Sequence, residues 1–118
     1  MTQNMNTDKN YLIDAEPLKA AIKAFNQPRG WMPYHNPRNL MLALVGEVGE
    51  LAEIFQWLTD EESRRLADDP ARWAHLNEEI ADVLIYLTSL SSALGVDLDA
   101  AVRDKLEKNA RKYPLPEA

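Results

Sequence analysis

Helix start and stop signals recur along this chain and divide it into helical segments joined by short loops. Asn36-Pro37 and Asp69-Pro70 each place a capping side chain directly before a proline, which is a common way to begin a helix. Thr59 and Glu62 have the spacing of a capping box, and Gly95 can end a helix in the left-handed conformation. No useful run of alternating apolar and polar residues predicts a strand. These signals predict an all-α fold.

The same signals predict four main helices and a short one, at about 14–26, 36–58, 59–67, 69–94 and 97–112, and either Asp97 or Asp99 can cap the last of them. Short loops favour antiparallel neighbours, so the expected architecture is an antiparallel helix bundle. The length of 118 residues suits a single domain, taken as 1–118, with 1–13 expected to be loosely ordered. The segment 80–94 is apolar on more than one face, which predicts burial between subunits and therefore a homo-oligomer.

Charge and composition exclude several classes of protein. The chain carries 19 acidic and 13 basic residues, for a net charge of −6, which argues against binding to a nucleic acid polymer. It has no cysteine, which excludes disulfides and thiolate metal sites. No apolar stretch approaches the length of a membrane span, and the first ten residues lack the apolar core of a signal peptide. We therefore expect a cytoplasmic protein without a membrane partner.

Two pairs of acidic residues lie on the two most apolar helices. Glu47 and Glu50 are three residues apart, as are Glu79 and Asp82, so each pair shares a helix face. Carboxylates among apolar neighbours are unfavourable unless they are paired or bind a cation. Hard divalent ions prefer oxygen ligands, so these four acids are predicted to bind Mg²⁺, with Mn²⁺ as a substitute.

Not every acidic residue of the chain is expected to bind a metal ion, and iron is an alternative to a hard cation. Three further acids are expected to be solvated: Glu61, Glu62 and Glu78. For Glu53 a solvated position and a functional one remain open. A di-iron site in a bundle needs Glu-x-x-His motifs, and neither His35 nor His75 completes one. A hard cation therefore fits better than iron, while a non-enzymatic helical binding module remains the competing class.

Two glycines interrupt the second helix close to the first acidic pair. Gly46 and Gly49 each cost a helix roughly 1 kcal/mol relative to alanine. A helix that retains two such residues is either closely packed there or needs room beside them.

The segments NLMLALVGEVGELAEIFQW (39–57) and EEIADVLIYL (78–87) resemble the MazG-like all-α nucleotide pyrophosphohydrolases, and most of all their dCTP pyrophosphatase branch. The family motif is Glu-x-x-Glu, a spacer and Glu-x-x-Asp, and the two acidic pairs match it. The similarity extends over about 25–114 and includes a closing Lys-x-x-x-Asn-x-x-x-Tyr-Pro pattern.

The resemblance implies Mg²⁺-dependent hydrolysis of a nucleoside triphosphate to the monophosphate and pyrophosphate. The expected substrate is a dNTP, most of all dCTP or a modified dCTP, with a broad-specificity house-cleaning enzyme as the alternative. It also implies a homo-oligomer, a dimer or a tetramer, with sites near subunit interfaces. By similarity, Glu47, Glu50, Glu79 and Asp82 bind the metal, and one of them helps to activate the attacking water.

The resemblance also suggests residues for the substrate pocket. Three aromatic residues match positions that line the nucleoside pocket of the dCTP branch: Trp31, Trp57 and Tyr86. Three others match positions that hold phosphates or sugar: Lys105, Asn109 and Tyr113. For His35, local packing and a hydrogen bond to the base are equally open, and Arg38 is a weaker phosphate candidate. Ile22 stands where the dCTP branch has a histidine, which puts the preference for cytosine in question.

Overall fold

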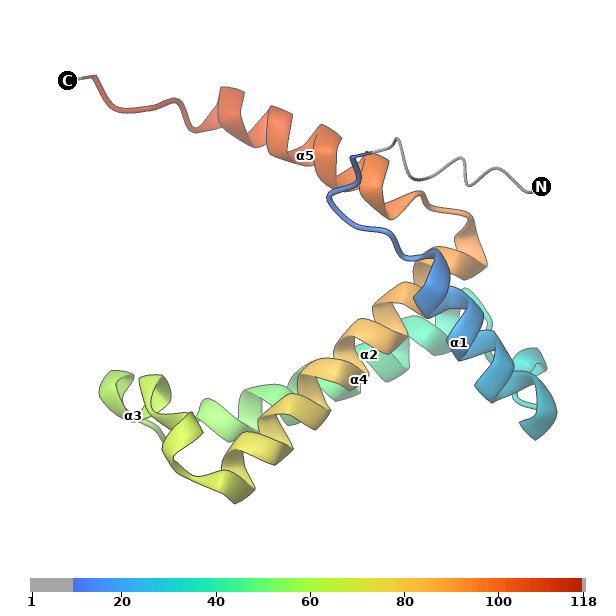
Figure 1. Cartoon of the computed structure of the whole chain (residues 1–118), viewed down its shortest axis with the longest axis horizontal. Coiled ribbons are helices and arrows are strands. Elements are labelled where there is room, and N and C mark those ends of the chain that lie inside the picture. The colour runs from blue at the N-terminus through green and yellow to red at the C-terminus, as the bar shows by residue number, and fades with distance from the viewer. Residues whose placement is uncertain (1–9, 118) are drawn as a thin grey trace.

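The computed structural model describes residues 10–117, and these contain five α-helices and no strand (Figure 1). The α-helices are α1 (Glu16–Asn26), α2 (Pro37–Phe55), α3 (Asp60–Arg64), α4 (Pro70–Leu94) and α5 (Leu98–Lys112). Short 3-10 turns lie at Gln27–Arg29, Met32–Tyr34 and Leu66–Asp68. The predicted all-α class, with four longer helices and a short one, is confirmed.

The capping residues act as the sequence predicts. The Asn36 side chain accepts the Asn39 N–H at 2.9 Å, and Asp69 accepts the amides at the start of α4. Thr59 and Glu62 form a complete capping box at α3, and Gly95 ends α4 with φ +73°. Local side-chain chemistry therefore determines where these helices begin and where α4 ends.

Several helix boundaries differ from the expected ones. The α2 helix ends at Phe55 rather than near residue 58, because the Leu58 N–H bonds the Phe55 carbonyl in a tighter turn. The α3 helix ends at Arg64, and a separate 3-10 turn follows. Of the two candidate caps for α5, Asp97 is the one used, and it accepts the Ala100 N–H.

Asp99 has a different role from capping. Its Oδ1 accepts the backbone N–H groups of Leu12 and Ile13, at 2.7 and 3.1 Å. Residues 10–13, expected to be loosely ordered, are thus held against α5, although they form no helix. The rest of the predicted loose segment, 1–9, lies outside the described residues.

The helices α2 and α4 lie side by side, α1 lies against α4, and the short α3 region joins the far ends of the pair (Figure 1). The buried apolar core between these elements is small: Leu40, Leu44, Leu66 and Leu76. Many large apolar side chains on the same helices are exposed, including Val45, Val48, Ile80 and Leu84. One chain therefore leaves much of the apolar surface of its central pair uncovered.

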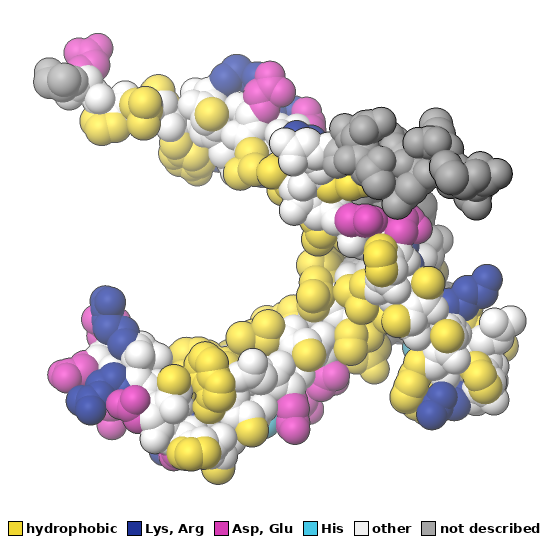
Figure 2. Space-filling model, in the orientation of Figure 1, with side chains coloured by type: hydrophobic (Ala, Val, Ile, Leu, Met, Phe, Trp, Pro, Cys, Tyr) yellow, Lys and Arg dark blue, Asp and Glu magenta, His cyan; other side chains and the backbone are white. Residues whose placement is uncertain are grey.

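The last helix stands apart from the central pair. Figure 2 shows a broad hollow between α5 and the α2–α4 pair, bordered by hydrophobic side chains. The radius of gyration is 18.1 Å, whereas a compact chain of this length has about 13–14 Å. Leu106, near the middle of α5, is 55% exposed. Among the described residues, no single helix is long and apolar enough to cross a membrane. Within the described part of the chain, only α4 and α5 taken together, with a bend of 101° between them, have the length and composition of a membrane span.

The two glycines of α2 face open space. An added Cβ at Gly46 or Gly49 would meet no atom of the described chain within 4 Å. Close packing within the chain is therefore not the reason for these glycines, and the interpretation that they leave room beside the helix stands.

Candidate functional site

The contact between α2 and α4 brings three carboxylates together. Oxygen atoms of Glu47, Glu50 and Glu79 all lie within 4.8 Å of one another, in a geometry that can hold a metal ion. Glu79 is buried, Glu47 is half-buried and Glu50 is exposed, so the cluster extends from the helix contact to solvent. The i,i+3 spacing on α2 places its two members on one face, and the packing of α4 supplies the third.

Among the described residues, no lysine or arginine forms an ion pair with the three acids of the carboxylate cluster. The pKa of Glu47 is raised from 4.5 to about 7. Burial is the largest cause, followed by the negative charges of Glu50, Asp82 and Glu79 and a hydrogen bond with Glu50. Within the described chain, Oε2 of Glu47 and Oε2 of Glu79 are buried without a hydrogen-bond partner. Unpaired buried carboxylate oxygens are unfavourable, and a bound cation would satisfy both, so the residues present fit a hard metal ion.

Asp82 lies one turn beyond Glu79 on α4. It does not belong to the three-residue group that the described residues form, but its charge acts on Glu47 and its side chain lines a neighbouring cavity. On the other side of the cluster, Nε2 of His75 lies 3.3 Å from Oε1 of Glu79. Asp82 therefore connects the carboxylate cluster with the cavity, whereas His75 supports the buried acid from the side.

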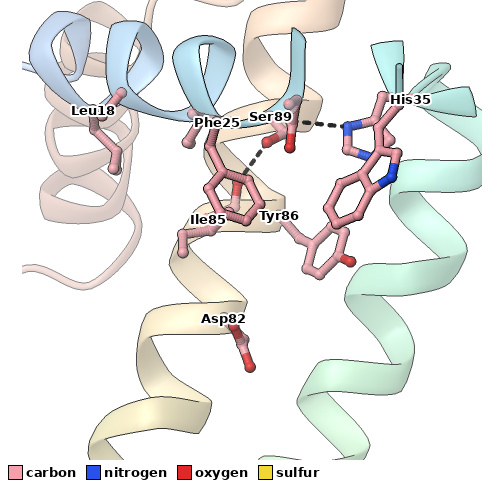
Figure 3. Close-up of a pocket in the computed structure, with 11 residues that line it drawn as sticks. Leu18, Phe25, His35, Asp82, Ile85, Tyr86 and Ser89 are labelled. Carbon is pink, nitrogen blue, oxygen red and sulfur yellow. Dashed lines mark hydrogen bonds between the residues drawn. The ribbon is translucent and has the colours of Figure 1, made fainter. Parts of the chain in front are cut away.

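The cavity has a volume of about 410 Å³ and lies between α1, the loop 31–35 and α4 (Figure 3). Its walls are mainly apolar and aromatic, with a few polar groups: Leu18, Ala21, Ile22, Phe25, Asn26, Trp31, His35, Asp82, Ile85, Tyr86 and Ser89. In Figure 3 the rings of Phe25 and Tyr86 are both seen above Asp82. A flat aromatic ligand can enter here and extend toward the acids.

The structure brings together three of the predicted pocket residues. Trp31, His35 and Tyr86 all line the cavity. The Trp31 ring meets that of Phe25 edge to face, with centroids 5.7 Å apart, and lies 6.4 Å from the His35 ring. Trp31 is 45% exposed, so its ring keeps a free surface.

Four other predicted residues do not reach the cavity within one chain. Trp57 follows the end of α2 and is 86% exposed. Lys105 and Asn109 lie on α5, with Tyr113 at its end, and Figure 1 places α5 away from α1. In the described part of the chain, none of the four lines this cavity.

Sequence reasoning missed several residues of the cavity wall. Phe25 was not predicted as a site residue, yet it lines the cavity and is 51% exposed, so this face of α1 does not pack into a closed core. Ile22 was noted only as a departure from the family, and it does line the cavity. Asn26 and Ser89 had no signal in spacing or composition, because their position depends on how α1 crosses α4.

Comparisons with known proteins agree with this arrangement. The family model described as MazG-like matches residues 43–118, which is more than half of the chain. The chain belongs to the MazG-like family. It is 50% identical over 99 residues to human dCTP pyrophosphatase 1 and 49% identical over 100 residues to the bovine protein. These matches cover 84% and 85% of this chain but only 58% and 59% of the relatives, so the chain spans under two thirds of their length.

A solved structure shares the fold of this MazG-like chain. A pyrophosphatase from Archaeoglobus fulgidus is 41% identical and superposes with a TM-score of 0.77. The match covers 91% of this chain and 98% of the archaeal one. The helices that carry the carboxylate cluster therefore belong to an architecture that a known pyrophosphatase also has.

Proposed function

We propose that this chain is a Mg²⁺-dependent nucleoside triphosphate pyrophosphohydrolase that converts dCTP or a modified dCTP to the monophosphate and pyrophosphate. The observation that carries the proposal is the carboxylate cluster beside an aromatic cavity, joined by Asp82. The names of the human and bovine relatives and of the archaeal structure support the same reaction class. The proposed unit is one domain, residues 1–118, in the cytoplasm.

The proposed metal ligands are Glu47, Glu50, Glu79 and Asp82. A bound divalent ion supplies neutralisation of phosphate charge and a more acidic water. Glu47 and Glu79 would hold the cation through buried Oε2 atoms that have no hydrogen-bond partner among the described residues. Glu50 is the exposed member of the cluster, so it can orient or deprotonate the water, with Glu53 as the other candidate.

The proposed nucleoside site is the aromatic cavity. Trp31 and Tyr86 enclose the base, and stacking on an aromatic side chain contributes about 1–3 kcal/mol per base. With the base in the cavity, the phosphates extend past Asp82 toward the acids. We place the base and the phosphates in this order because Asp82 lines the cavity and its charge also acts on Glu47 of the carboxylate cluster.

We further propose that the chain acts as a homo-oligomer, a dimer or a tetramer, in which a second copy completes an antiparallel bundle. The exposed apolar side chains of α2 and α4 and the open surface at Gly46 and Gly49 support this. In such an assembly Lys105, Asn109 and Tyr113 of the second copy hold phosphates or sugar. Trp57 reaches a nucleoside in the same way.

The test is pyrophosphate release from a panel of dNTPs and NTPs, with and without Mg²⁺. We expect dCTP to be turned over only with the metal and to have the highest kcat/KM. Mn²⁺ is expected to substitute for Mg²⁺. Absence of turnover for every nucleotide, together with no thermal shift on adding Mg²⁺, would favour a non-enzymatic binding module instead. Sedimentation of the full chain checks the oligomeric state.

A second candidate is a broad-specificity enzyme of the same reaction class. It is favoured by Ile22, an apolar wall residue where the resemblance leads one to expect a hydrogen-bonding histidine. The same panel separates the two, because a broad enzyme has similar kcat/KM for several bases.

A further inference from the structure

Asn26 is a buried polar residue in the wall of the aromatic cavity. It is the last residue of α1 and is only 7% exposed. Its side-chain nitrogen, Nδ2, lies 3.2 Å from Nδ1 of His35. A buried amide needs a hydrogen-bond partner, and the ring of His35 provides it.

The chemistry of this contact determines where the ring carries its proton. An amide nitrogen has hydrogens to donate and cannot accept, so Nδ1 of His35 is the acceptor. A neutral imidazole has one N–H, and the bond at one ring nitrogen decides the state of the other. With the Asn26 amide in this orientation, a neutral His35 ring carries its proton on Nε2.

The backbone around His35 holds the ring in place. The His35 N–H donates to the Met32 carbonyl at 3.1 Å, and the Trp31 N–H donates to the Asn26 carbonyl at 3.3 Å. The side chain of Asn39 donates to the Tyr34 carbonyl at 3.0 Å. These bonds support the loop 31–35 from both ends and fix the backbone position from which the His35 ring reaches Asn26.

His35 brings a ring N–H to the wall of the cavity, in addition to the indole N–H of Trp31 and the phenol O–H of Tyr86. In Figure 3 its ring lies at the edge of the cavity, with one nitrogen at the end of a dashed line. The Ser89 hydroxyl already donates to the Ile85 carbonyl at 2.8 Å, and an ionised Asp82 can only accept. The walls at Ile22 and Phe25 are apolar.

We propose that Asn26 is a positioning residue that holds His35 in the Nε2–H form, so that the cavity offers a donor to an acceptor atom of the nucleobase. This rests on the proposed function, since it assumes that the base occupies the cavity. The ring carbonyl and the unprotonated ring nitrogen of cytosine are acceptors of this kind. A role of Asn26 in loop packing alone would make the site of the ring proton irrelevant to binding.

The tautomer is measured first, in the ligand-free protein, by ¹⁵N NMR of the histidine rings at a pH where they are neutral. We expect Nε2 of His35 to be protonated in the wild type. In Asn26→Asp the new carboxylate can only accept, so the proton moves to Nδ1 and Nε2 becomes an acceptor. Gln27→Glu is the matched control, because it also turns an amide into a carboxylate, next to Asn26, at an exposed side chain that does not line the cavity.

The functional measurement is KM and kcat for dCTP, together with the dissociation constant of dCMP. In Asn26→Asp we expect KM and the dCMP dissociation constant to rise about tenfold, equivalent to ~1.4 kcal/mol. We expect kcat to change by less than about twofold, since the lost contact is made equally before and during reaction. Gln27→Glu is expected to keep both the tautomer and the dCMP affinity of the wild type.

Each arm can overturn the inference on its own. If the His35 ring of the wild type is protonated on Nδ1, the inference is wrong. This result needs no variant, so the inference stays testable even if Asn26→Asp does not fold. A swapped tautomer with unchanged dCMP affinity would also overturn it, and the proposed hydrolysis would stand. Loss of turnover for every nucleotide, with dCMP binding that still depends on the tautomer, would instead remove the proposed function alone.

Discussion

The carboxylate cluster and the aromatic cavity share α4, yet they are built in different ways. The cluster uses acids three residues apart on two helices that lie side by side. The cavity collects side chains from α1, the loop 31–35 and a later part of α4. The first arrangement follows from helical periodicity once two helices meet. The second depends on the angle at which a third element crosses them.

The two regions also differ in electrostatics. The cluster holds like charges close together, and burial together with these charges raises the pKa of Glu47 to about 7. The cavity is mostly aromatic and apolar, with Asp82 at its border with the cluster. Substitutions in the cluster should therefore change turnover and metal binding, whereas substitutions in the cavity should change the affinity for the base.

The largest expected effect tests the cluster. Glu79→Gln removes the charge of the most buried ligand and should lower kcat by more than about 100-fold, because even outer-shell partners of metal ligands contribute 10–100-fold. Pyrophosphate release measures it. Glu78→Gln, the neighbouring exposed acid, is the matched control and should retain activity. Equal losses in both variants would mean that charge near α4, and not ligation, is what matters.

The next effect tests the cavity. Trp31→Ala removes the proposed stacking surface and should raise KM for dCTP by about 5–150-fold, with kcat much less affected, because stacking contributes about 1–3 kcal/mol per base. Trp73→Ala is the control, since Trp73 is 46% exposed, close to the 45% of Trp31, but does not line the cavity. An unchanged KM in Trp31→Ala would place the base elsewhere.

A third variant asks whether both regions are complete within one chain. Leu106→Glu places a charge on the exposed apolar face of α5 and should dissociate the oligomer, as sedimentation would report. We expect the Mg²⁺-induced thermal shift to persist, because the cluster is formed within one chain. Affinity for dCTP should fall about tenfold, equivalent to ~1.4 kcal/mol, because Lys105 of a second copy is lost.

Lys108→Glu is the control for this variant. Lys108 lies two residues on from Leu106, about 200° around the helix, and pairs with Asp104 at 2.9 Å. It should remain oligomeric with unchanged affinity for dCTP. If Leu106→Glu stays oligomeric and active, α5 does not contribute to the site of another copy.

The smallest expected effect is a pH dependence that belongs to the cluster alone. The pKa of Glu47 is about 7 when folded, against 4.5 for the free side chain, so the metal-free folded state binds the proton more tightly. Its contribution to stability is complete below pH 4.5 and is lost as the pH rises through 7. We expect the metal-free Tm to fall over this range by about 4 °C more in the wild type than in Glu47→Gln.

Adding Mg²⁺ should reverse this trend. A cation takes the place of the proton, so the Mg²⁺-induced increase in Tm should grow as the pH rises past 7. Cavity variants such as Tyr86→Phe should keep the wild-type dependence. A metal-free Tm profile identical in wild type and Glu47→Gln would contradict the assignment of Glu47 to a charged, buried cluster.

The helices and the cluster were predictable from sequence because their causes are local. Asn36, Thr59 and Asp69 cap the helices that follow them through backbone groups two or three residues away. Glu47 and Glu50 share a face of α2 because they are three residues apart, which is also a local cause. The end of α2 was predicted three residues too late, because a tight turn at Leu58 competes with the helix there.

By itself, the sequence determined the all-α class, most of the helix starts and the acids that face one another, since each depends on neighbours within one or two turns. It also signalled, through the apolar segment 80–94, that one chain does not cover its own apolar surface. Only the tertiary structure decided that Phe25 and Asn26 line a cavity with Trp31, and that α5 stands apart from it. These outcomes depend on how α1 crosses α4 and on the direction of the chain after Gly95, which residue spacing does not encode.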